Sequence, residues 1–104
     1  MIRQFDVFPN PLRDDRKEKP FVLNVQHYLL DHLGTRITGP LLTKRSVKET
    51  SRLHPQVTVA GDVLYFDPTD LVPMPLRFLK KPIASLESES FRIIAALDLV
   101  FTGV

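Results

Sequence analysis

Apolar and polar residues alternate in short runs along the first part of the chain. A period of two, with β-branched and aromatic residues between Pro, Gly and Asp, is typical of β-strands. Such runs occupy residues 4–7, 21–26, 57–60, 63–66 and 74–79. The runs on either side of Gly61-Asp62 predict a hairpin. A weaker run at 36–42 contains Gly39-Pro40, which indicates a bulge or an edge strand.

The loops and the last segment of the chain differ from these runs. Residues 9–20 are rich in charge and proline, and they predict a solvated loop between the first two strands. None of the nine prolines follows Pro82, so a sizeable helix is expected only after it. We expect Ser85 to cap this helix, with Glu87 and Glu89 in its first turn and Gly103 at its end.

The apolar residues of this helix cover more than one side. One stripe comprises Ile94, Leu97 and Phe101, and a second comprises Ile93, Ala96 and Val100. A helix that is apolar on two sides is buried on two sides. One small sheet covers one side, so we expect the other to meet a second chain, with Ile93 or Val100 at the contact.

Composition narrows the class of protein. A chain of 104 residues fits a single domain, residues 1–104, and its net charge of +2 gives no basic stripe for nucleic acid. There are no cysteines, no apolar run long enough to span a membrane, and no signal-peptide pattern at the start. We therefore expect a soluble, cytoplasmic domain without a membrane partner.

No arrangement of residues predicts catalysis. His27, His32 and His54 lack the spacing of metal ligands and are read as surface or half-buried side chains. The isolated glycines form no phosphate loop, and there is no nucleophile elbow. A binding protein without metal or cofactor is the expectation.

Three stretches share an ordered set of residue types with one known family. They are FVLNVQHYLLD followed by GTRITGPL at 21–31 and 34–41, Leu-His-Pro-x-Val with the glycine hairpin at 53–61, and LVFTGV at 99–104. In this order, and over nearly the whole chain, they resemble the CcdB family of toxins, which poison DNA gyrase.

The resemblance implies a mainly β fold, a small SH3-like, CcdB-like antiparallel β-barrel or sheet with one C-terminal α-helix, homodimeric through that helix. CcdB-like toxins bind DNA gyrase A and trap the enzyme with its DNA cleaved. Carried over position by position, the implied gyrase contacts are Leu29, Leu30, Asp98, Phe101, Thr102, Gly103 and Val104. Without the resemblance, Leu29 and Leu30 would be assigned to the core, Phe101 to helix packing, and Gly103 to a helix C-cap.

One position departs from the family. Thr102 stands where the family has a tryptophan, the residue type most enriched in binding hot spots. Either the contact uses less area, or poisoning is weakened or lost. We expect it to be retained, because the rest of the site pattern stands.

The resemblance also implies an antitoxin, a disordered segment that folds on the toxin and neutralises it. Arg13, Arg16, Lys44 and Arg45 are the expected contacts. Operator DNA and transcription regulation would involve the toxin only through this antitoxin, and plasmid maintenance is a further role that the resemblance implies. Two alternatives stay open: an endoribonuclease toxin on a similar barrel, which needs a basic groove with acid–base residues, and a non-toxic dimeric module, which Thr102 favours.

Overall fold

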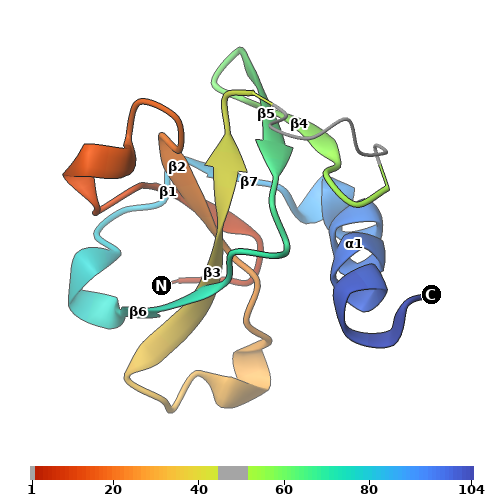
Figure 1. The fold of residues 1–104 in the computed structure, drawn as a ribbon. Coiled ribbons are helices and arrows are strands. Elements are labelled where there is room, and N and C mark those ends of the chain that lie inside the picture. Colours follow the sequence, from red (N-terminus) through yellow and green to blue (C-terminus); the bar gives the residue numbers. More distant parts are fainter. Residues whose placement is uncertain (1, 45–51) are drawn as a thin grey trace.

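The computed structural model describes residues 2–44 and 52–104 (Figure 1). These described residues form seven strands: β1 (Asp6–Pro9), β2 (Phe21–Asn24), β3 (Thr35–Leu42), β4 (Gln56–Val59), β5 (Asp62–Phe66), β6 (Val72–Pro75) and β7 (Ala84–Ser85). Short 3-10 turns η1 (Arg13–Asp15), η2 (Tyr28–Leu30), η3 (Leu76–Phe78) and η4 (Glu87–Glu89) join them, and α1 is Ser90–Thr102. All pairings are antiparallel, in the order β4-β5-β3-β2-β1-β7 with β6 on β3, and the sheet curls into a nearly closed barrel. The predicted mainly β fold with one helix is confirmed.

Strand β3 is the centre of the sheet, so the prediction of a bulged or edge strand at 36–42 is wrong. One edge of β3 pairs with β2, while the other pairs first with β6 and then with β5. Pro40 lies where the partner changes, and its carbonyl accepts a hydrogen bond from the Asp67 N–H at 3.1 Å. The missing N–H of proline therefore faces a junction rather than a continuous ladder. Gly39 is required beside it, because a Cβ there would lie 2.5 Å from Cε1 of Phe66.

Both faces of the central strands are covered. Val7 lies in the larger core cluster, whereas its neighbour Phe8 lies in a smaller cluster on the other face. Leu23 and Val22 of β2 divide in the same way. Only β4 shows the expected strict alternation of exposed and buried residues among the described strands longer than two residues.

Two strand boundaries differ from those predicted from the sequence. The hairpin between β4 and β5 turns at Ala60 and Gly61, both with positive φ, one residue earlier than predicted. The run at 74–79 is a strand only to Pro75, after which η3 forms and the Leu79 N–H donates to the Leu76 carbonyl at 3.0 Å. Alternating prolines at 73 and 75 leave few N–H groups for pairing, which shortens this strand.

Helix α1 packs on the barrel through one side. Ile93 and Ala96 are 0% exposed, and Ile93 belongs to the larger core cluster, against which Leu97 also packs. The prediction that Ile93 contacts a second chain is therefore wrong, because Ile93 faces the protein's own sheet, whereas Val100 of the same predicted stripe is exposed. Gly103 ends the helix with φ +76° and donates its N–H to the Asp98 and Leu99 carbonyls, both at 3.2 Å, as predicted.

The start of the helix differs slightly from the prediction. Glu87 and Glu89 form the separate turn η4, and α1 begins at Ser90. The prediction that Ser85 caps the helix is wrong: its hydroxyl accepts a hydrogen bond from the Glu87 N–H at 3.3 Å, but Ser85 lies in β7, and the N-cap of α1 is Glu89, which makes no side-chain capping bond. No helix in the described part of the chain is long and apolar enough to cross a membrane.

Candidate protein-binding surface

The η2 loop, residues 27–34, presents large apolar side chains to solvent. Leu29 is 69% exposed and Tyr28 67%, and Leu30 and Leu33 are exposed as well. Leu29 and Leu30 are therefore not core residues. Clustered apolar side chains on a protein surface mark sites of interaction with other molecules.

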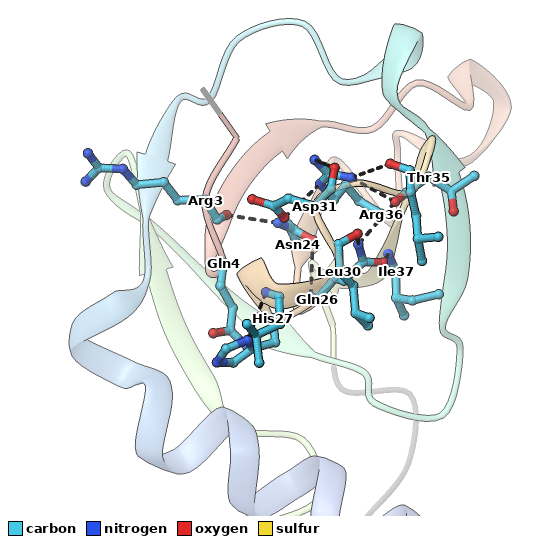
Figure 2. Close-up of polar contacts among 12 residues, drawn as sticks. Arg3, Gln4, Asn24, Gln26, His27, Leu30, Asp31, Thr35, Arg36 and Ile37 are labelled. Atoms are coloured by element: carbon cyan, nitrogen blue, oxygen red, sulfur yellow. Dashed lines mark hydrogen bonds and ion pairs between the residues drawn. The ribbon is translucent and has the colours of Figure 1, made fainter.

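Two buried side chains fix the shape of this loop. Gln26 is only 5% exposed, and its amide donates to the carbonyls of Leu30 at 3.1 Å and Thr35 at 3.2 Å. Its oxygen accepts from the Ile37 N–H at 3.1 Å. The Gln26 side chain is thus hydrogen-bonded both to the loop, at Leu30, and to β3, at Thr35 and Ile37 (Figure 2).

Arg36 holds the other half of the loop. It is 6% exposed, and its guanidinium donates to the carbonyls of Leu33 at 2.9 Å, Thr35 at 3.0 Å and Asp31 at 3.2 Å. Its Nε also lies 3.5 Å from the Asp31 carboxylate. Figure 2 shows Arg36 beside Asp31 and Thr35. Buried charge of this kind is tolerated because the loop backbone surrounds it with acceptors.

Asn24 extends the network toward the start of the chain. It is fully buried, donates to the Arg3 carbonyl at 3.0 Å, and accepts from the Gln26 N–H at 3.2 Å. The Gln4 amide donates to the Val25 carbonyl at 3.1 Å. The polar residues 24, 26 and 36 thus form a connected support under the exposed loop (Figure 2).

The second apolar surface is the outward side of α1 and its end. Phe91, Ile94 and Phe101 are exposed along this side, and Asp98 lies between them at helical spacing. Val104 is also exposed. Since Ile93 and Ala96 face the barrel, this outward side is the one without a partner in the described part of the chain.

The end of the helix is organised by its own hydrogen bonds. The Thr102 hydroxyl donates to the Asp98 carbonyl at 2.7 Å and accepts from the Val104 N–H at 3.4 Å. Figure 1 places the η2 loop and this end of α1 toward the same end of the molecule. The seven residues predicted to contact gyrase therefore lie on two exposed elements, the loop and the helix end.

A basic hollow lies elsewhere on the surface. Arg13 and Arg16 of the loop after β1 line it together with Lys80 and Lys81, over a volume of about 750 Å³. Its apolar lining includes Phe78 and Ile83, both partly exposed. The guanidinium of Arg77 lies 4.7 Å from the Phe78 ring centre, close enough for a cation–π contact.

The other predicted antitoxin contacts are not part of this hollow. Lys44 is exposed and lines a different hollow with Lys17, Lys19 and Asp67. A hydrogen bond from Lys19 to the Asp70 carboxylate, at 3.0 Å, raises the pKa of Lys19. Arg45 lies outside the described residues.

The histidines have separate local roles. Nδ1 of the exposed His27 accepts from the Leu29 N–H at 3.1 Å and so caps η2. His54 is buried, with Nε2 3.6 Å from the Asp67 carboxylate. Over residues 2–44 and 52–104, no group of three His, Asp or Glu side chains is placed to hold a metal ion.

The sequence alone did not indicate that Gln26 and Arg36 support the η2 loop, or that Lys80 and Lys81 line the basic hollow with Arg13 and Arg16. Gln26 and Arg36 stood within the matched stretches, but neither residue type indicates burial by itself. Lys80 and Lys81 are far from Arg13 in sequence, so only the fold brings these side chains together.

A family model described as CcdB protein matches residues 4–103 of the chain. The match covers both candidate surfaces except for the last residue, Val104. No curated protein matches the sequence.

Proposed function

Because the chain belongs to the CcdB family, we propose that it is the toxin of a type II toxin–antitoxin system, which binds DNA gyrase A and traps the gyrase–DNA cleavage complex. The observation that carries this proposal is the exposed apolar surface of the η2 loop, together with the exposed end of α1. The protein acts by binding, and the chemistry of DNA cleavage remains that of gyrase.

The proposed gyrase contacts are Leu29, Leu30, Asp98, Phe101, Thr102, Gly103 and Val104. Leu29 and Phe101 are 69% and 70% exposed, so each offers apolar area that a partner can bury. A few side chains that are fully buried near the centre of an interface contribute most of its binding energy. Asp98 adds one carboxylate that can select a donor on the partner.

We propose a homodimer through the outward side of α1, with Ile94 rather than Ile93 at the contact. Phe91, Ile94 and Phe101 form an apolar stripe that no element of the described chain covers. A twofold contact through this stripe would bring two helix ends together, which suits a partner that is itself a dimer. Phe101 would then lie at the border between the two contacts.

The antitoxin is proposed to bind the basic hollow through an acidic, disordered segment. Arg13, Arg16, Lys80 and Lys81 supply positive charge around an apolar floor. Opposite charge on the partner speeds association and fixes its orientation. Lys44 would contact another part of the same segment, since it lines a separate hollow. Operator DNA is reached only through the antitoxin.

The second candidate is a dimeric module of the same fold without toxicity, which Thr102 favours. Its hydroxyl is engaged with the Asp98 carbonyl, and its side chain is too small to fill an aromatic pocket. The variant Thr102→Trp separates the two functions. If poisoning is retained, Thr102→Trp should bind gyrase A about tenfold more tightly, since an aromatic anchor adds on the order of 1–3 kcal/mol. A non-toxic module would show no gyrase binding before or after the change.

Induced expression tests the proposal in cells. The unaltered chain should stop the growth of a gyrase-sensitive bacterium, and a strain with a resistant gyrase A should survive. Equal growth arrest in both strains would contradict a gyrase target. Growth of both would favour the non-toxic module.

A further inference from the structure

The η2 loop depends on side chains outside it for its conformation. It contains one 3-10 turn, Tyr28–Leu30, and a turn of this length is not stable alone. Local hydrogen bonds, such as that from the Leu33 N–H to the Leu30 carbonyl at 3.0 Å, do not reach the sheet. The contacts of Gln26 and Arg36 with the carbonyls at 30, 31, 33 and 35 do.

These contacts couple the position of the loop to the burial of a charge. The Arg36 guanidinium is almost completely buried; its acceptors are the carbonyls at 31, 33 and 35, and its Nε forms an ion pair with the Asp31 carboxylate at 3.5 Å. If the loop moved away, the guanidinium would lose these acceptors, and Gln26 would lose the Leu30 carbonyl. A buried polar group without partners is strongly unfavourable, so displaced loop conformations are rarely populated.

We infer that Gln26 and Arg36 are positioning residues for partner recognition: they preorganise the η2 loop so that Leu29 and Leu30 meet gyrase A already in place. The inference rests on the proposed function. A loop held in its bound conformation binds without the entropy loss of ordering it, so affinity depends on residues that the partner does not touch.

Matched substitutions separate positioning from general stability. Gln26→Met replaces one uncharged side chain by another of similar length and removes the hydrogen bonds to the loop. Arg36→Met removes the guanidinium with its hydrogen bonds, and Arg36→Lys keeps the positive charge without the forked geometry. The control is Thr38→Val on β3, the strand that carries Arg36. Thr38 is 1% exposed, and its hydroxyl donates to the Val72 carbonyl, outside the loop.

The measurement is the Kd for purified gyrase A, for each variant alone and in a Leu29→Ala, Leu30→Ala background. Gln26→Met should raise the Kd about tenfold in the unaltered background. The reason is that the loop, no longer held by the Gln26 hydrogen bonds, must be ordered on binding. In the double-alanine background the same change should have less than about a twofold effect, because the positioned side chains are gone. Thr38→Val should change the Kd less than about twofold in both backgrounds.

Amide hydrogen exchange gives a second readout in the free protein. The Leu30 and Leu33 N–H groups should exchange faster in Gln26→Met and Arg36→Lys than in Thr38→Val. Should Arg36→Met fail to fold, the uncharged Gln26→Met still decides the question.

The outcomes distinguish the two proposals. If Gln26→Met weakens binding equally in both backgrounds, its role is structural and the inference is overturned. If the unaltered chain does not bind gyrase A, the proposed function fails and the inference falls with it. Binding by the unaltered chain with a loss confined to the intact Leu29-Leu30 background supports both.

Discussion

Two adjacent isoleucines on α1 test how the helix is used. Ile93 is 0% exposed and packs on the barrel, whereas Ile94 is 44% exposed on the outward side. The variants Ile93→Ala and Ile94→Ala remove the same three carbons from neighbouring positions of one helix. Each variant is therefore the control for the other.

The expected magnitudes differ because the environments differ. Ile93→Ala leaves a cavity in the core and should lower the free energy of unfolding by about 2–5 kcal/mol. The three carbons of Ile94 carry about 2.4 kcal/mol of transfer free energy at about 0.8 per carbon. A dimer contact would bury the 44% of Ile94 that is exposed, which is worth about 1 kcal/mol per protomer. Twofold symmetry doubles this to about 2 kcal/mol, or about a 30-fold rise in the dimer Kd.

Two assays separate the effects. Urea unfolding at one fixed protein concentration gives stability, and sedimentation over a range of concentrations gives the dimer Kd. Ile94→Ala should shift dissociation without a large change in the stability of the monomer. A monomeric unaltered protein at micromolar concentration would refute the dimer. Equal destabilisation by both variants would refute the assignment of the two sides.

Three further outcomes follow from the packing and charges. Gly39→Ala places a methyl group 2.5 Å from a core aromatic carbon and should cost about 2 kcal/mol in urea unfolding; an unchanged midpoint would contradict this close approach. Removal of residues 102–104 should abolish gyrase binding while the Tm falls by no more than about 5 °C, and a folded, fully toxic truncation would contradict the site. The double reversal Arg16→Glu, Lys80→Glu should weaken antitoxin binding about tenfold at low salt, and more than Lys44→Glu does; equal effects would exclude the hollow as the main contact.

Local features of the fold were predictable from the sequence because local physics decides them. Gly103 ends the helix as its freedom at positive φ requires, and the hairpin turns at a glycine. The order of strands around β3 was not predictable in this way. Pro40 indicates an edge when only its neighbours are considered, but the fold places it at a junction between two partner strands.

The candidate site shows the same division. The exposure of Leu29 was not readable from the residues, since an aliphatic pair after a strand is more often buried. The resemblance to a known family supplied that prediction. Neither route found the support by Gln26 and Arg36, because hydrogen bonds to backbone carbonyls depend on how the loop folds back over β3.

The most direct test of the central claim is a cleavage assay with purified gyrase, supercoiled DNA, ATP and the unaltered chain. Treatment with detergent and protease should release linear DNA in proportion to the added chain, and gyrase assembled with a resistant gyrase A should give none. Linear DNA at the level of gyrase alone, at concentrations of the chain that saturate gyrase A, would contradict gyrase poisoning.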